Sequence, residues 1–258
     1  MSSSSRPHAA LFILEAPEGL PCLLAGDLPL KAGDRARLVS CGIAPEALDR
    51  VEAFQSAKRR REFLWGRLLL ARALKFWGPD LQIRERAPLT PAVVDDAGVV
   101  QGCASISHTQ GLVAVMLSAS NCAVDLEVMN PARVRRALVE HVFGAGFWEA
   151  LAENPTTGFY ALWGLYETAV KLGARLELTH AENGLCAGMP PLTEAYCGFS
   201  LLAHNALATV VASSPCPVQL MRARPCASSG DIAGFEAAGA APLARLAAFQ
   251  PASLSLEG

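Results

Sequence analysis

The feature that most constrains the fold is a pair of apolar runs separated by a short polar turn. Leu112–Leu117 is the first run, Ser118–Asn121 is the turn and Cys122–Val128 is the second run. Apolar and β-branched residues bounded by small polar residues are typical of paired strands, so we expect a β-hairpin. Asp125 and Glu127 lie two residues apart on the second run, and the period of a strand places both carboxylates on one face. The sequence therefore predicts a hairpin that presents two acidic side chains together.

A third acidic side chain lies in a segment with helical spacing, Phe159–Lys171. Its stripe at four-residue spacing contains Phe159, Trp163, Glu167 and Lys171. In the simplest interpretation the two aromatic rings seat a core helix, and Glu167 and Lys171 form a surface pair that contributes about 0.2–0.5 kcal/mol. In the alternative interpretation, the carboxylate and the ammonium face the acidic strand and take part in a site.

The rest of the chain shows both helical and strand patterns, which predicts an α+β fold. Helical apolar spacing extends over residues 45–77 and 131–143. Further strands are expected over residues 9–14, 20–25, 81–86, 92–100, 184–188, 196–203 and 207–212. From Ser213 the chain is rich in Pro, Ala, Ser and Gly, with a weakly helical patch near Leu243–Phe249, so we expect an appendage or an extra edge element there.

A short internal similarity indicates how these elements are organised. His108–Ser118 resembles His204–Ser213 with one residue gapped. We therefore predict two similar α+β halves in a pseudo-twofold arrangement, over residues 1–118 and 119–215, followed by a Pro/Ala/Gly-rich C-terminal extension over residues 216–258. A coincidence between two strands is the alternative interpretation of the same match.

The composition is that of a globular protein, with 52% apolar and 18% charged residues. The net charge of −2 gives no general attraction to nucleic acid or to a membrane surface. No apolar run approaches the ~18 residues of a membrane span. The N-terminal segment does not resemble a secretory leader, so we expect the 8 cysteines to be reduced and mostly buried in a cytoplasmic protein.

The three carboxylates indicate a divalent cation. Asp125, Glu127 and Glu167 would repel one another unless a metal or basic groups lay between them. Mg²⁺ takes one or two carboxylates, keeps several waters and bridges to phosphate oxygens, so it suits such a set. The cationic side chains expected nearby are those of Arg59, Arg67, His108 and Lys171. Arg67 lies in an apolar stripe, where it needs an anionic partner or a snorkelling position at the edge. A metal combined with cations suits the binding of a polyphosphate and a phosphoryl-type transfer.

The order of the motifs adds a resemblance to a known family. The motifs are, in order, Lys58-Arg59 with Gly66-Arg67, then Ser-Ile-Ser-His-Thr ending at Thr109, then Val-Asp-Leu-Glu ending at Glu127, then Phe-x-x-x-Trp-x-x-x-Glu-x-x-x-Lys ending at Lys171. This order resembles the 4′-phosphopantetheinyl transferases of the surfactin-synthetase-activating and enterobactin type, over about residues 58–171. The resemblance implies two similar α+β halves and an Mg²⁺-dependent enzyme. Such an enzyme would transfer the phosphopantetheine arm of coenzyme A to a serine of an apo acyl or peptidyl carrier protein and release 3′,5′-ADP.

The resemblance also implies a role for each matching residue. Asp125, Glu127 and Glu167 would be the Mg²⁺ ligands, and Glu167 would also activate the carrier serine. Lys171 would neutralise or protonate the leaving phosphate. The residues that match ligands of the nucleotide phosphates are Arg59, Arg67, Ser107, His108 and Lys171.

The implied partners are coenzyme A and an acidic apo carrier protein of a secondary-metabolite or fatty-acid-like pathway, with no nucleic acid and no membrane. The candidates for the carrier-docking face are the basic residues Arg133, Arg135 and Arg136 and the apolar Phe143. A solvated side of a helix is the alternative interpretation for each of them. Two halves within one chain can build the site without a second subunit, so we expect a monomer.

The chain departs from the family pattern at Tyr166, where the third motif usually has a lysine. A tyrosine can donate a hydrogen bond to a phosphate, but it brings no charge. This leaves open a second interpretation, a non-catalytic relative that binds coenzyme A or a carrier protein. A third interpretation is an unrelated α+β protein with a coincidental acidic cluster.

Overall fold

The computed structural model describes residues 7–15, 32–86, 89–151, 154–181, 184–192, 194–226 and 231–246. Within these residues helices are combined with three β-sheets of seven, four and two strands. The fold is therefore mixed, in agreement with the predicted α+β class. None of the helices in the described part of the chain is long and apolar enough to cross a membrane.

The helices are α1 (Ala32–Ser40), α2 (Pro45–Glu52), α3 (Ala57–Trp77), α4 (Arg136–Phe143), α5 (Phe147–Ala150) and α6 (Pro155–Lys171), with 3₁₀ turns η1 (Pro131–Arg133) and η2 (Ala203–Asn205). The seven-stranded sheet, called the first sheet, has the spatial order β12 (Asp231–Ala241), β11 (Val218–Cys226), β1 (Ala9–Glu15), β5 (Leu112–Ser118), β4 (Val100–Thr109), β3 (Leu89–Val94) and β2 (Gln82–Arg86). The four-stranded sheet, called the second sheet, has the order β13 (Ala244–Arg245), β9 (Tyr196–Leu202), β10 (Ala206–Ala212) and β6 (Cys122–Val128). The two-stranded sheet contains β7 (Glu177–Ala181) and β8 (Gly184–Gly188).

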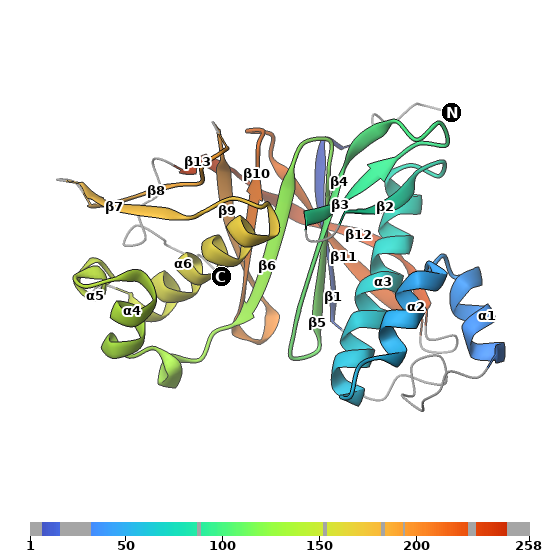
Figure 1. Ribbon diagram of the computed structural model, residues 1–258, viewed down its shortest axis with the longest axis horizontal. Helices are drawn as coiled ribbons and strands as arrows, with labels where there is room; N and C mark the ends of the chain where they lie inside the picture. The colour runs from blue at the N-terminus through green and yellow to red at the C-terminus, as the bar shows by residue number, and fades with distance from the viewer. Residues whose placement is uncertain are drawn as a thin grey trace.

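The two larger sheets lie in the middle of the molecule, with α3 on one flank and α6 on the other (Figure 1). On β1, Ala10, Phe12 and Leu14 belong to the core formed with α2 and α3. Leu11 and Ile13 alternate with them and belong to a separate core between the two sheets. A third core lies between α6 and the outer face of the second sheet. Strands buried on both faces must be apolar along their whole length, which explains the unbroken apolar runs of β1 and β5.

The two strands predicted around residues 118–121 are confirmed, but the hairpin predicted between them is wrong. Strand β5 pairs with β1 and β4, whereas β6 pairs with β10. The chain therefore passes from the first sheet to the second at this turn. A strand that is fully buried on both faces is most stable with a partner on each edge, and β1 and β4 occupy both edges of β5.

The two sheets meet along a seam where β6 lies against β4. The N–H groups on the outer edge of β6 donate hydrogen bonds to the side chains of alternate β4 residues instead of to the backbone of another strand. These bonds, each spanning 19 residues, are Cys122 N–H to Cys103 Sγ (2.9 Å), Val124 N–H to Ser105 Oγ (3.1 Å) and Leu126 N–H to Ser107 Oγ (3.1 Å). Buried backbone donors need partners, so these three side chains satisfy the edge of the second sheet.

Two predicted elements are divided in the structure. The single helix predicted over residues 45–77 is two helices, α2 and α3, separated by residues 53–56. Ser56 caps α3, because its hydroxyl oxygen accepts a hydrogen bond from the N–H of Arg59. The strand predicted over residues 92–100 is the end of β3 and the start of β4, separated by a turn in which Asp95 Oδ1 accepts from the N–H of Val99 (2.9 Å).

The C-terminal segment rejoins the first sheet. Strand β11 pairs in parallel with β1, and β12 pairs with β11, so the segment supplies two strands at the edge of that sheet. The helical patch predicted near residues 243–249 is wrong where the structure describes it, because Ala244–Arg245 forms β13. The strands predicted over residues 9–14, 81–86, 184–188, 196–203 and 207–212 correspond to β1, β2, β8, β9 and β10. The strand predicted over residues 20–25 lies outside the described residues.

The approach of α6 to the second sheet depends on Gly164. A Cβ atom at this position would lie 2.2 Å from Thr209 Oγ1 and 2.7 Å from Thr209 Cβ on β10. We expect Gly164→Ala to lower the free energy of unfolding by about 1–3 kcal/mol, because neither buried element can move freely. Urea unfolding measures this change. Gly33→Ala on α1, where a Cβ meets nothing within 4 Å, is the matched control, and equal stabilities of the two variants would contradict the prediction.

Candidate functional site

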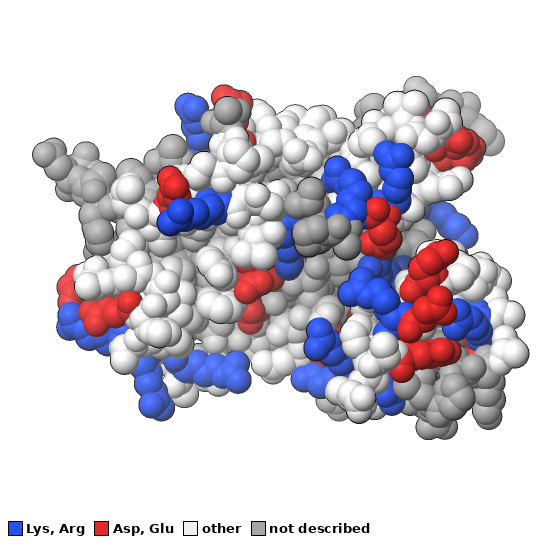
Figure 2. Space-filling view, viewed as in Figure 1, with Lys and Arg blue, Asp and Glu red and all other residues white. Residues whose placement is uncertain are grey.

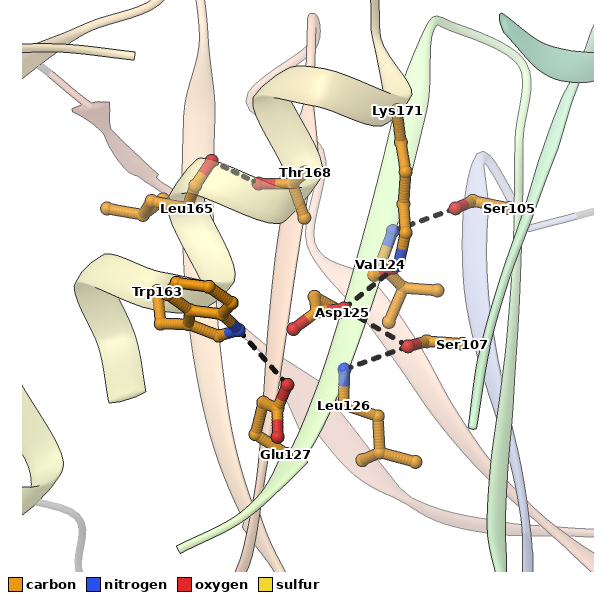
Figure 3. Close-up of polar contacts among 10 residues, drawn as sticks. All are labelled: Ser105, Ser107, Val124, Asp125, Leu126, Glu127, Trp163, Leu165, Thr168 and Lys171. Carbon is orange, nitrogen blue, oxygen red and sulfur yellow. Dashed lines mark hydrogen bonds and ion pairs between the residues drawn. The ribbon is translucent and has the colours of Figure 1, made fainter. Parts of the chain in front are cut away.

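The centre of the candidate site is Asp125, which lies on β6 between the seam and α6. Its side chain is 7% exposed. The carboxylate oxygen Oδ1 accepts from Lys171 Nζ (2.9 Å) and from Ser107 Oγ (3.2 Å) (Figure 3). Lys171 comes from the last turn of α6 and Ser107 from β4, so one oxygen is held by both flanks of the strand.

The other oxygen of Asp125, Oδ2, is buried and has no hydrogen-bond partner among the described residues. In Figure 3 it points away from Ser107, toward the side on which α6 lies. A buried carboxylate oxygen without a donor is costly, so this atom is available to a cation, a water or another bound partner.

Glu127 lies two residues farther along β6, on the same side of the strand (Figure 3). Its Oε1 accepts from the indole N–H of Trp163 on α6 (3.1 Å). Burial, with an added contribution from the Asp125 charge, raises the pKa of Glu127 to about 6. The pKa of Glu167 on α6 is also raised, by burial and by the same Asp125 charge, while Lys171 opposes the shift. The Asp125 charge therefore lies close enough to disfavour the ionisation of Glu127 and Glu167.

Lys171 connects the acidic strand to the helix. Its Nζ donates to Asp125 Oδ1 and to the backbone oxygen of Val124 (2.8 Å). The side chain is 26% exposed, so the ammonium is reached by solvent while it pairs with a buried carboxylate. This placement agrees with the second interpretation of the helical stripe, in which its Glu and Lys face the acidic strand. In the stripe, the rings of Phe159 and Trp163 stack 6.3 Å apart.

His108 on β4 lies between helix α3 and the acidic side chains of the site. Its Nδ1 lies 3.5 Å from Glu62 Oε2 on α3. Burial lowers the pKa of His108; Glu62 opposes this shift, and the positive charges of Lys171 and Arg59 reinforce it. Charges on both α3 and α6 therefore act on the imidazole. The basic flank, formed by His108 and Arg59, thus adjoins the acidic side chains of β6 and α6. In Figure 2 acidic side chains lie near the middle of this face, over β6 and α6, and basic side chains lie over α3 and the elements beside it, together with further acidic ones.

The two α3 arginines lie in different surroundings. The Arg67 guanidinium pairs with Glu85 on β2 (2.5 Å) and lies 5.1 Å from the ring centre of Phe63. The anionic partner that its apolar stripe required is thus Glu85. Arg59 lies 5.1 Å from the ring centre of Phe54, and its side chain forms no ion pair within the described residues.

The carboxylates do not form a closed metal cage. Among the described residues no three His, Cys, Asp or Glu side chains converge closely enough to hold a metal ion. The chemistry of the set nevertheless fits Mg²⁺, because Asp125 Oδ2 has no partner and because burial and the neighbouring Asp125 charge, which raise the pKa values of Glu127 and Glu167, are both offset by a bound cation. Glu127 would leave or share its contact with Trp163 to reach such an ion.

The structure brings together Asp125, Glu127, Glu167, Lys171 and His108, with Arg59 near the basic flank. It gives Ser107 a different place from the expected one, since its hydroxyl is bonded to Asp125 and to the backbone of β6 instead of being directed outward to a phosphate. Sequence reasoning missed Glu62 and the donor role of Trp163. Glu62 lies one turn after Arg59, but a charged residue at the end of a basic run usually indicates a solvated helix face.

The raised pKa of Glu127 predicts the pH dependence of stability. Unfolding returns this carboxyl to its ordinary value near 4.5, so between pH 4.5 and about 6 the folded state holds a proton that the unfolded state releases. Stability therefore falls as the pH rises through this window. We expect Glu127→Gln, which keeps an acceptor for Trp163, to raise the free energy of unfolding at pH 8 but not at pH 4. Urea unfolding at both pH values measures the difference, and an equal effect at both would contradict the prediction.

The chain matches no family model, and no curated protein matches it. Its function is therefore inferred from the chemistry of the site.

Proposed function

We propose that this protein transfers the 4′-phosphopantetheine arm of coenzyme A to a serine hydroxyl of an apo acyl or peptidyl carrier protein, with Mg²⁺, and releases 3′,5′-ADP. The observation that carries the proposal is the pairing of Asp125 with Lys171 beside Glu127 and Glu167, next to the basic flank of His108 and Arg59. Carboxylates for a cation and cations for phosphates thus meet at the seam of the two sheets. Such a combination suits a pyrophosphate substrate.

Each residue of the chain has a defined task in this reaction. Asp125, Glu127 and Glu167 would hold Mg²⁺, which supplies positive charge to the pyrophosphate oxygens. Glu167 accepts the proton of the carrier serine as its oxygen attacks the β-phosphorus, and its raised pKa makes it a better base than an exposed carboxylate. Lys171 neutralises the departing phosphate of 3′,5′-ADP. His108 and Arg59 bind the phosphates of the nucleotide. Arg67, which is paired with Glu85, adds positive charge for the same phosphates.

We further propose that the chain consists of two similar halves. Support comes from the long helix of each half, α3 beside the first sheet and α6 beside the second. The internal similarity of the sequence falls on β5 and β10, each preceded by residues with positive φ. These residues are Gln110 and Gly111 before β5, and His204 and Asn205 before β10. The residues of the proposed site lie on β4, β6, α3 and α6 of one chain, as a monomeric enzyme requires.

Among the candidates for carrier docking, Arg133 and Arg135 are exposed next to α4. Arg136 is paired with Glu140 and Glu149. An acidic carrier helix would therefore meet the first two arginines more easily than the third, whose charge is already balanced.

Intact-mass spectrometry of apo carrier proteins incubated with this protein, coenzyme A and Mg²⁺ tests the proposal. We expect one phosphopantetheine to be added per carrier, and we expect a chelator to prevent the addition. No mass gain on any of a panel of acyl and peptidyl carriers would overturn the transferase.

A second candidate function is a non-catalytic protein that binds coenzyme A or a carrier protein. Tyr166 favours it, because this residue precedes Glu167 at the position where the family that the chain resembles has a lysine. The tyrosine side chain carries no positive charge. It is 43% exposed, and its ring packs against Trp163 with 5.8 Å between the ring centres. If this candidate is correct, the wild-type protein is silent in the mass assay but binds coenzyme A, and Tyr166→Lys gains activity. Transfer by the wild-type protein would contradict it.

A further inference from the structure

The Ser107 hydroxyl is fully used inside the protein. Ser107 is buried. Its Oγ donates to Asp125 Oδ1 (3.2 Å) and accepts from the N–H of Leu126 (3.1 Å). A serine hydroxyl has one proton to donate, and here that proton is directed to a carboxylate. Ser107 is therefore not oriented to donate to an external anion (Figure 3).

We propose that Ser107 is a positioning residue that holds the Asp125 carboxylate in the orientation needed for a divalent cation, and that it is not a ligand of the nucleotide. This inference rests on the proposed function, because it assigns the metal site of that same reaction. It concerns the orientation of one side chain and makes no use of contacts with a substrate.

The positioning role follows from the different surroundings of the two Asp125 oxygens, since Oδ1 is hydrogen-bonded and Oδ2 is not. The terminal torsion of an aspartate is broad, so a free carboxylate can present either oxygen in many orientations. Lys171 and Ser107 both donate to Oδ1, one from α6 and the other from β4. These two donors hold Oδ1 and leave Oδ2 as the oxygen without a partner. Both donors are also bonded to the backbone of β6. Ser107 is the more rigid of the two, because its side chain is shorter and it is buried, whereas Lys171 is partly exposed.

The seam provides internal controls for this role. Ser105 makes the same type of bond to the N–H of Val124 but contacts no carboxylate in the described structure. Cys103 accepts from the N–H of Cys122 at 2.9 Å, so a thiol can serve as the backbone acceptor at this seam. A cysteine at position 107 would therefore keep the contact with β6 but donate only weakly to Asp125. A cysteine at position 105 makes the same chemical change without affecting a carboxylate.

The test measures the affinity of Mn²⁺, an oxygen-seeking substitute for Mg²⁺, from the loss of the free-ion EPR signal. We expect Ser107→Cys to bind Mn²⁺ roughly tenfold more weakly than the wild type, as for other residues that orient metal ligands. Ser105→Cys is expected to keep the wild-type affinity, and Ser107→Thr, which retains the hydroxyl, to restore most of it. Thermal melting checks that each variant is folded, and Ser107→Ala gives the same comparison if the thiol is not accommodated.

Binding of 3′,5′-ADP without metal, measured by calorimetry, separates positioning from direct contact with a phosphate. A positioning residue leaves this affinity unchanged, so a large loss in Ser107→Cys would overturn the inference. Equal Mn²⁺ affinities of Ser107→Cys and the wild type would overturn it as well. If the wild type binds Mn²⁺ but modifies no carrier, the transferase fails while the positioning role stands. If the wild type binds no Mn²⁺, both fail.

Discussion

Asp125→Asn is expected to lower kcat/KM for carrier modification at least about 100-fold, and to remove most of the affinity for Mg²⁺. Within the described residues, Asp125 Oδ2 is the one carboxylate oxygen that is buried and has no hydrogen-bond partner. An amide presents a neutral oxygen in its place and cannot balance a divalent charge. The amide can still accept hydrogen bonds from Lys171 and Ser107, so the variant is expected to fold.

The initial rate of phosphopantetheine transfer, followed by intact mass at several Mg²⁺ concentrations, measures this effect. Glu236→Gln on β12 is the matched control, because it also neutralises one carboxylate, but on an exposed strand at the edge of the first sheet. Wild-type rates in Asp125→Asn would refute its role as a metal ligand. Equal losses in both variants would point to net charge instead of to the site.

Lys171→Met is expected to lower the free energy of unfolding by about 2–4 kcal/mol, a large effect for one side chain. The substitution keeps the apolar stem of the lysine but leaves Ser107 as the side-chain donor to the buried Asp125 carboxylate among the described residues. Removing one partner of a buried ion pair typically costs 3–5 kcal/mol. We expect somewhat less here, because Lys171 is partly exposed and water can reach the vacated position.

Urea unfolding at neutral pH measures this loss, and a double-mutant cycle assigns its cause. Asp125→Asn/Lys171→Met removes both charges, so its stability is expected to lie well above that of Lys171→Met alone. Lys58→Met is the matched control, because Lys58 is exposed and its long 3.8 Å pair with Glu62 contributes about 0.5 kcal/mol or less. A loss in Lys171→Met no larger than in this control would show that the Asp125 pair does not stabilise the fold.

The faces of individual elements could be predicted from the sequence. The period of a strand placed Asp125 and Glu127 on one side of β6, with Val124 and Leu126 in the core between the sheets. The spacing of a helix placed Lys171 with Trp163 on the side of α6 that contacts β6. These periods follow from local backbone geometry, which every residue of an element obeys whatever its distant partners are.

Which elements meet could not be predicted in the same way. The apolar runs of β5 and β6 suit a hairpin as well as they suit two separate sheets, and only the presence of β1 and β4 on both edges of β5 decides between them. The parallel pairing of β11 with β1 joins parts of the chain that are about 200 residues apart. No local period records such a contact.

The same distinction holds within the site. Sequence alone determined that acidic and basic side chains of the right types lie on β6, α6 and α3. Only the tertiary structure decided that Ser107 donates to Asp125, that Trp163 donates to Glu127 and that His108 lies beside Glu62. The physical reason is that a hydrogen bond or an ion pair depends on distances of a few ångströms between elements, and those distances are set by how whole sheets and helices pack.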